Sequence, residues 1–144
     1  MLFRSLYRDS DGYVRLYDME GNFQSNVTGI FYYSSSVYTG VGDNNYYYLV
    51  DGVVQEGYGL VALQENSTTY LFYVLEDGTL LKETGGCTFY VSKTNGYKVN
   101  GVAVQSGLYY FDANGHMYFG NSLLTGNTEF GVISSGTATI GGGH

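Results

Sequence analysis

Apolar residues along the chain occur in short runs, each followed by a polar turn that ends in glycine. Five runs of four or five residues are rich in Tyr, Phe, Val and Leu, and each turn has Asp or Asn before its glycine. Such turns favour β-hairpins because Asp, Asn and Gly reach positive φ at low cost. A second short strand is expected after each turn. The pattern predicts five hairpins, whose first strands and turn glycines are 14–17 and Gly21, 46–50 and Gly52, 71–75 and Gly78, 88–91 and Gly96, and 108–111 and Gly115.

The spacing of the later turns indicates a repeat. The glycines at 78, 96, 115 and 136 are 18, 19 and 21 residues apart, which fits one hairpin and one connector per unit. A single hairpin cannot bury its apolar face, so neighbouring units must cover each other. We therefore expect an all-β fold without helices, in the form of a solenoid of stacked β-hairpin repeats, with 18 to 21 residues per unit.

The first half of the chain departs from this pattern. We interpret 31–38 as a degenerate hairpin, 59–63 as an extra strand and 64–68 as a polar loop. The last unit has lost its tyrosines. The sequence thus predicts a single repeat domain over 1–140, whose parts are an irregular half at 1–69, regular repeats at 70–126 and a terminal cap at 127–140, followed by a flexible tail at 141–144.

The composition agrees with strands and turns. The 144 residues include 22 Gly, 17 Tyr and 8 Phe but no Pro or Trp. Aromatic side chains fit a half-buried pleated surface, and glycine permits tight turns. The net charge of −7 and the scattered Lys and Arg residues argue against binding to a phosphate backbone, so we expect no nucleic-acid partner. No apolar run is long enough to span a bilayer, and we expect no membrane insertion.

Candidate chemical groups are few. Cys87 is the only cysteine, which excludes an internal disulfide and favours a small buried thiol. The segment Asp9-Ser10-Asp11-Gly12 is similar to the start of a calcium loop, but Tyr13 stands where a further oxygen ligand belongs, so a plain turn is favoured. His116 follows a hairpin turn, and the sequence has no serine elbow, metal-spaced histidine set or phosphate loop. We expect no catalytic residue, metal or cofactor.

Residues 101–120 carry the most specific motif of the chain. They read Gly-Val-Ala-Val-Gln-Ser-Gly-Leu-Tyr-Tyr-Phe-Asp-Ala-Asn-Gly-His-Met-Tyr-Phe-Gly. This string resembles the cell-wall-binding repeat family, which includes choline-binding modules, glucan-binding repeats and the repetitive region of large clostridial toxins. The shared pattern is Tyr109-Tyr110-Phe111, the turn from Asp112 to Gly115, Met117 and Gly120. The resemblance implies a β-hairpin solenoid that attaches a bacterial secreted or cell-surface protein to a surface.

The resemblance is not uniform. Choline-binding repeats carry tryptophans at the positions of Val102 and Leu108, and tryptophan is the best wall for a quaternary ammonium ion. Glucan-binding and toxin-type repeats depend more on Tyr and Phe, so a glycan remains an open ligand class. The match is weaker over 70–101 and faint over 12–57 and 126–140.

Tyrosine suits sugar recognition because its ring packs on the apolar side of a pyranose while its hydroxyl bonds to sugar hydroxyls. The same rings could instead form the stacking core of the repeats. Because side chains alternate across a strand, Tyr109 and Phe111 should share one face and Tyr110 the other. The candidate ligand-binding residues are the tyrosines of the three best-formed units: Tyr109, Tyr110, Tyr118, Tyr73, Tyr90 and Tyr97.

The sequence therefore favours a non-catalytic surface-binding module. Its expected partner is cell-wall glycan or extracellular polysaccharide, held in tyrosine-lined grooves between hairpins. Two alternatives stay open. One is a structural repeat protein that self-assembles into fibres through unpaired edge strands, and the other is a protein-binding adhesin repeat.

Overall fold

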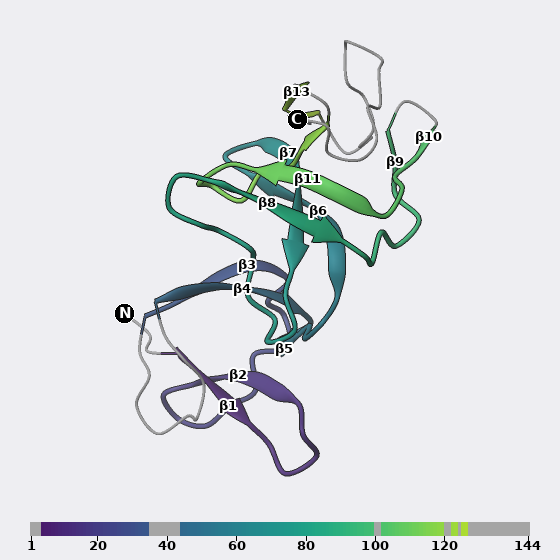
Figure 1. Cartoon of the computed structure of the whole chain (residues 1–144). Coiled ribbons are helices and arrows are strands. Elements are labelled where there is room, and N and C mark those ends of the chain that lie inside the picture. The colour runs from purple at the N-terminus through teal and green to yellow at the C-terminus, as the bar shows by residue number, and fades with distance from the viewer. Residues whose placement is uncertain (1–3, 35–43, 100–101, 120–121, 124, 127–144) are drawn as a thin grey trace. The chain divides into compact units, whose positions relative to one another are not determined.

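The structure, a computed structural model, shows an all-β chain (Figure 1). Its described part contains strands and turns but no helix, and every strand pairing in it is antiparallel. The predicted fold class is confirmed at this level. The residues that the structure describes are 4–34, 44–99, 102–119, 122–123 and 125–126.

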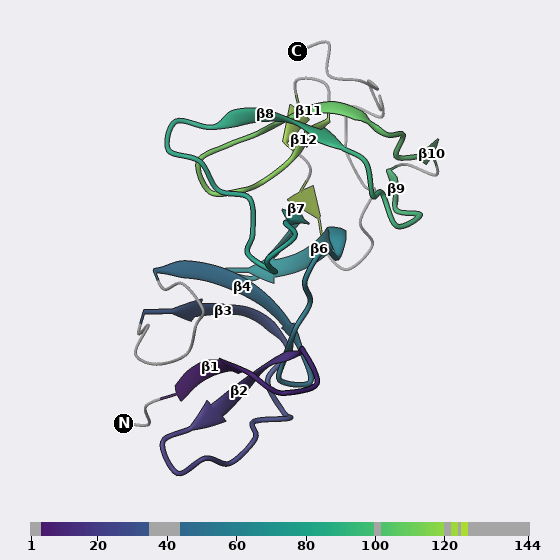
Figure 2. The ribbon, with the colours of Figure 1, turned by 60° about the horizontal axis from the view of Figure 1, so that its bottom comes forward.

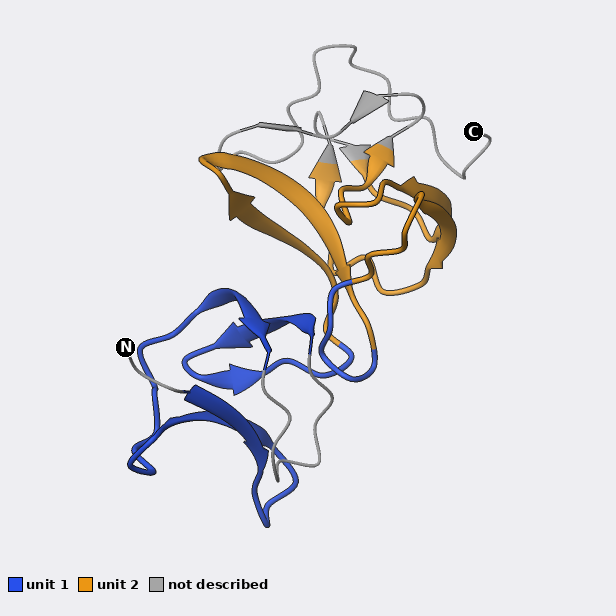
Figure 3. Ribbon diagram, turned by 90° about the vertical axis from the view of Figure 1, so that its left-hand side faces the viewer, with its two compact units in different colours: residues 1–57, 76–80 blue, residues 58–75, 81–144 orange. Residues whose placement is uncertain are grey.

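The chain forms two compact units, shown in blue and orange in Figure 3. Unit 1 consists of residues 1–57 and 76–80, and unit 2 of residues 58–75 and 81–144. Each has a hydrophobic core of its own. The predicted division of the domain at 69 and 126 stays a prediction. Gly136, the cap at 127–140 and the tail at 141–144 lie outside the described residues.

Unit 1 is built on one five-stranded sheet with the order β1-β2-β5-β4-β3. The hairpins β1–β2 and β3–β4 are visible as two ribbons in Figure 2, and β5 joins them through the pairing of Arg15 with Val53. Alternating apolar side chains point to one face and form the core. The strands are β1 (Arg4–Arg8), β2 (Val14–Asp18), β3 (Gly29–Tyr33), β4 (Asn45–Val50) and β5 (Val53–Val54).

Three of the expected turns close hairpins or bridges in unit 1. Asp51 and Gly52 have φ values of 50° and 79°, as a type I′ turn requires, and β4 pairs with β5 around them. A Cβ at Gly52 would collide with the Gln24 carbonyl, so only glycine fits there. The turn at Gly21 is closed by the bridge between Tyr17 and Phe23. The plain turn at 9–12 connects β1 to β2, and the Gly12 amide donates to the Asp9 carbonyl at 2.9 Å.

Unit 2 contains four smaller sheets. One has the order β14-β7-β6, and the others are the pairs β11-β8, β10-β9 and β12-β13. Tyr109, Phe111 and Met117 are completely buried in its core, together with Leu60 and Leu71. The strands are β6 (Gly59–Glu65), β7 (Thr68–Val74), β8 (Cys87–Val91), β9 (Lys98–Val99), β10 (Val102–Ala103), β11 (Gly107–Phe111), β12 (Tyr118–Phe119), β13 (Ser122–Leu123) and β14 (Thr125–Gly126).

The interpretation of 64–68 as a polar loop is wrong. The extra strand expected at 59–63 is present as β6, but it continues to Glu65 and forms seven residue pairs with β7. The turn consists of Asn66 and Ser67, both at positive φ (53° and 69°). The sequence signal was missed because serine rarely adopts positive φ, and because the polar ends of both strands resemble a loop.

Two expected hairpins have different partners from those that the local pattern suggested. After the turn at Gly78, Thr79 bridges to Tyr47 and the Leu80 amide donates to the Tyr46 carbonyl, so this segment completes unit 1. After the turn at Gly96, the short β9 pairs with β10, whereas β8 pairs with β11 over five residue pairs. The glycine turns therefore form, but a longer register elsewhere outcompetes a two-residue strand next to the turn.

Other pairings also join segments that are distant in sequence. β14 pairs with β7 through Thr125 and Tyr70, and β3 pairs with β4 rather than closing a hairpin within 31–38; of that expected hairpin, 35–38 lie outside the described residues. These sheets do not show the predicted solenoid of stacked local hairpins.

Candidate functional site

The ribbon formed by β8 and β11 has one buried and one exposed face. Tyr109 and Phe111 point into the core, and each is 0% exposed. Their neighbour Tyr110 is only partly buried, and Leu108 is 50% exposed. The predicted alternation along 108–111 is thus confirmed, and the core lies on the side of Tyr109.

The exposed side of this ribbon gathers apolar and aromatic groups. Leu108 lies opposite Tyr90, and Tyr110 lies opposite Thr88 in the β8–β11 register. Tyr90 is 56% exposed. We name the surface made by Thr88, Tyr90, Leu108, Tyr110 and Tyr118 the outer face. None of its five residues is charged, which is a notable property in a chain of net charge −7.

Tyr118 reaches the outer face through the turn that follows β11. The Asp112 amide donates to the His116 carbonyl at 3.0 Å, and Met117 bridges to Phe111, which brings the next residue back beside the ribbon. The rings of Tyr110 and Tyr118 then meet edge to face, with centroids 5.3 Å apart. Burial is the main cause that raises the pKa of Tyr118, so its hydroxyl stays protonated at neutral pH.

A glycine supports the ring of Tyr110 from below. Gly86 has φ of +82°, and a Cβ there would lie 2.7 Å from the Tyr110 Cζ atom. The Tyr110 hydroxyl points to the Gly85 carbonyl at 3.5 Å, a long hydrogen bond. Gly86 therefore lets the aromatic ring lie flat on the backbone, which holds it at a defined height on the outer face.

Two of the candidate tyrosines lie in the core instead. Tyr109 is fully buried, and its hydroxyl donates to the Gln105 carbonyl at 2.7 Å. Tyr73 is 7% exposed, its ring lies 5.1 Å from that of Phe89, and its hydroxyl is 3.3 Å from Ser92 Oγ. Both rings fill space between strands and are separated from solvent.

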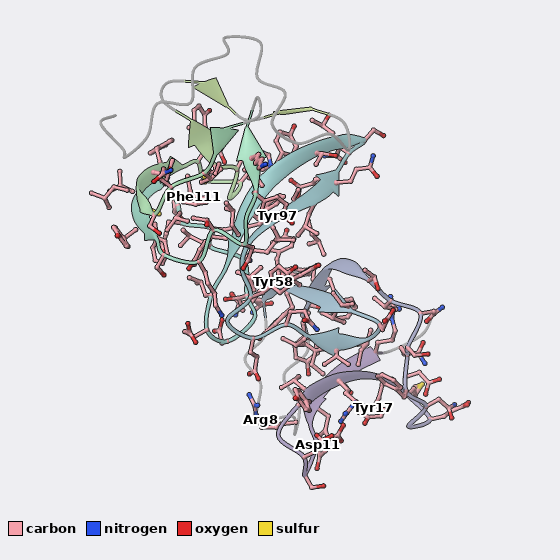
Figure 4. All side chains as sticks on the ribbon, turned by 90° about the vertical axis from the view of Figure 1, so that its right-hand side faces the viewer. Arg8, Asp11, Tyr17, Tyr58, Tyr97 and Phe111 are labelled. Carbon is pink, nitrogen blue, oxygen red and sulfur yellow. The ribbon has the colours of Figure 1, made fainter. Side chains whose placement is uncertain are left out.

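Tyr97 covers the edge of β6, a role that the sequence did not suggest. Its hydroxyl accepts a hydrogen bond from the Ala62 amide at 3.1 Å, and burial raises its pKa. Asn95 donates to the carbonyls of Tyr58 and Leu60 at 2.7 and 2.9 Å. The Tyr58 and Tyr97 side chains are labelled in Figure 4. The turn around Asn95 thus satisfies edge groups of β6 that would otherwise face solvent.

His116 belongs to the interior of unit 2. Its ring is stacked on Tyr70, with centroids 3.6 Å apart and an angle of 5°, and it meets Phe72 edge-on. Its Nε2 lies 2.8 Å from Glu65 Oε1. At 7% exposure, the imidazole joins β6, β7 and the turn after β11, and it does not face the outer face.

The remaining chemical groups have simple environments. Cys87 is half-buried, and burial together with the nearby Glu83 charge raises the pKa of its thiol. Among the residues that can be described, no three His, Cys, Asp or Glu side chains gather where they could hold a metal ion. In the same residues, no helix is long and apolar enough to span a membrane.

Three of the six candidate tyrosines therefore meet on one surface: Tyr90, Tyr110 and Tyr118. Leu108 was missed as a site residue, although the alternation of β11 places it on the same side as Tyr110. Comparison with protein-family models, with curated proteins and with solved structures finds no match. The resemblance to cell-wall-binding repeats therefore stays a prediction.

Proposed function

We propose that this chain is a non-catalytic surface-binding module that attaches a bacterial secreted or cell-surface protein to cell-wall or extracellular polysaccharide. The observation that carries the proposal is the outer face, an uncharged surface of three tyrosines and a leucine on a strand ribbon whose opposite side is buried. The resemblance of residues 101–120 to surface-attachment repeats points in the same direction.

The chemistry of the outer face suits a sugar chain. Tyrosine offers an apolar ring face and a hydroxyl, which together match the two sides of a pyranose. Tyr90 and Leu108 provide exposed apolar area side by side, while the edge contact of Tyr110 and Tyr118 fixes two hydroxyl-bearing rings next to them. An open face of this kind can accept the middle of a long polymer, whereas an enclosed pocket would require a chain end.

Self-assembly through edge strands is the main competing function. The covering of β6 by Asn95 and Tyr97 speaks against pairing at that edge, because the Leu60 and Ala62 amides already have partners in Lys93 and Tyr97. The hairpin solenoid remains the finer form of the fold that we propose for the repeats, and the adhesin function remains an outcome of the tests below.

The proposal is tested by affinity electrophoresis in gels that contain neutral polysaccharides (dextran, laminarin and yeast mannan), and by sedimentation with purified Gram-positive cell walls. We expect retention of the wild-type chain in at least one case. Tyr90→Ala and Leu108→Ser should each weaken retention about threefold to tenfold, as the loss of one aromatic or apolar contact suggests. Tyr32→Ala, which changes a tyrosine that is 46% exposed in unit 1, is the matched control.

The outcomes separate the functions. If the wild-type chain is folded by circular dichroism but is not retained on any polysaccharide or cell wall, the proposed function is wrong and the adhesin alternative gains support. If retention is normal but is unaffected by Tyr90→Ala and Leu108→Ser, the outer face is not the binding surface. Light scattering that rises with concentration would favour self-assembly, and a monomer at high concentration would exclude a fibre.

A further inference from the structure

The β1–β2 hairpin of unit 1 carries a second concave surface, far in sequence from the outer face. It is an open groove of about 460 Å³, within the range of roughly 300–1,000 Å³ that is typical of small-molecule sites. We name it the β1–β2 groove. Its lining residues are Ser5, Tyr7, Asp9, Tyr17, Asp18, Met19 and Gly21.

Strand alternation creates this groove. Leu6 and Leu16 face each other across the two strands and point into the core, where both are 0% exposed. The neighbouring pair Ser5 and Tyr17 therefore points to the opposite side, as does Tyr7 two residues further along β1. Tyr7 is 49% exposed, so its ring lies at the surface diagonally across from Tyr17.

Hydrogen bonds fix the inner wall of the groove. The Tyr17 hydroxyl donates to Asp9 Oδ2 at 2.6 Å, and Arg15 Nη1 donates to the same oxygen at 2.8 Å. Arg15 also donates to Asp11 at 2.8 and 3.0 Å. Asp11 and Tyr17 are labelled on this hairpin in Figure 4. The hydrogen bond to Asp9 raises the pKa of Tyr17, so the hydroxyl remains neutral at physiological pH.

The turn after β2 forms the rim. Asp18 accepts hydrogen bonds from the backbone amides of Glu20 and Asn22, both at 2.9 Å, which hold the turn in one conformation. Met19 projects from this turn and is 65% exposed. The groove thus offers an aromatic ring and a flexible thioether at its surface, with hydroxyl and carboxylate groups inside.

We propose that the β1–β2 groove binds a neutral sugar ring and is a second glycan contact of this protein, a proposal that rests on the polysaccharide-binding function above. The Tyr7 ring and the Met19 side chain would contact the apolar side of the ring, and Ser5, Asp9 and Asp18 would bond its hydroxyls. The carboxylates of Asp9 and Asp18 repel an anionic sugar, and Arg15 is already engaged by Asp9 and Asp11. A neutral hexose therefore fits this site better than a uronic acid or a phosphorylated sugar.

A second contact changes the binding of a polymer more than that of a short oligosaccharide. Once one site holds a polymer, the local concentration of sugar units near the other site on the same polypeptide is high, and two weak contacts combine into a stronger one. We therefore expect loss of the groove to weaken retention on long polysaccharides more than binding of a single trisaccharide.

The experiment uses the full chain in affinity electrophoresis with the neutral polysaccharides named above and with polygalacturonate as the anionic counterpart. We expect Tyr7→Ala to weaken retention on the neutral polymer about threefold to tenfold, and the combination with Tyr90→Ala to weaken it further. Tyr32→Ala is again the control. Circular dichroism confirms folding, and Met19→Ser serves as a second groove variant if Tyr7→Ala does not fold.

Each result decides one of the two proposals. Weakened retention for Tyr90→Ala, together with unchanged retention for Tyr7→Ala and Met19→Ser, would overturn the groove site and leave the proposed function intact. Retention on polygalacturonate that depends on Tyr7 would overturn the assignment to a neutral sugar. A wild-type chain that no polymer retains would remove the function and the groove site together.

Discussion

The clearest test of the division between core and surface compares two tyrosines on adjacent strands. Tyr109 of β11 is 0% exposed and Tyr90 of β8 is 56% exposed, although the sequence gave both the same candidate role. Truncation of a fully buried aromatic side chain typically costs about 3–5 kcal/mol, because apolar burial is lost and a cavity remains. We therefore expect Tyr109→Ala to lower the free energy of unfolding of unit 2 by about that amount.

Two further variants resolve the contributions to this effect. Tyr109→Phe keeps the ring but removes the hydroxyl that donates to the Gln105 carbonyl at 2.7 Å, and such a neutral hydrogen bond contributes about 1 kcal/mol. Tyr90→Ala removes a ring that is mostly in solvent, so its cost should be within about 0.5 kcal/mol. The expected order of destabilisation is Tyr109→Ala, then Tyr109→Phe, then Tyr90→Ala.

The assay is urea unfolding at 25 °C followed by far-ultraviolet circular dichroism, with the two units fitted as separate transitions if the curve shows them. Free energies follow from linear extrapolation, and unchanged m-values would show that the variants share the wild-type unfolded state. A cost below about 1 kcal/mol for Tyr109→Ala, or an equal cost for Tyr90→Ala, would refute the assignment of these residues to core and surface. If Tyr109→Ala is unfolded without urea, Tyr109→Phe still tests the order.

Three other predictions concern groups outside the outer face. Asn95→Ala should uncover the edge of β6 and increase concentration-dependent association in analytical ultracentrifugation, with Lys98→Ala as the control; an unchanged monomer would contradict the role of Asn95. His116→Ala should cost about 2–4 kcal/mol in urea unfolding, because a buried ring stacked on Tyr70 and its bond to Glu65 are lost, and a loss below about 0.5 kcal/mol would show that the ring is not part of the core. The amide of Asn22 lowers the pKa of Asp18 in the folded chain, so this group stabilises unit 1 above the ordinary aspartate pKa of about 3.9 and loses that effect as the pH falls through its folded value. Asp18→Asn should therefore flatten the loss of stability between neutral and acidic pH, and an identical pH profile would exclude the contribution.

Part of the candidate site followed from the sequence. Strand alternation placed Tyr109 and Phe111 on one face and Tyr110 on the other before any coordinates were considered. Tyr90, Tyr110 and Tyr118 were selected correctly as members of aromatic strands, and the structure brings them together. Which face of β11 is buried could not be predicted, because it depends on the position of Phe89, Val91 and the core behind them.

The sequence by itself determined the strand content and the turns. An Asp-Gly or Asn-Gly turn depends on the φ preferences of two residues, and this is why the turn at Gly52 and the turn from Asp112 to Gly115 are where the pattern predicted them. The tertiary structure alone decided the partners. Thr79 and Leu80 pair within unit 1, and β8 pairs with β11, because strands compete for partners over the whole chain and the longest register with the most buried apolar surface wins. No local pattern records the outcome of that competition.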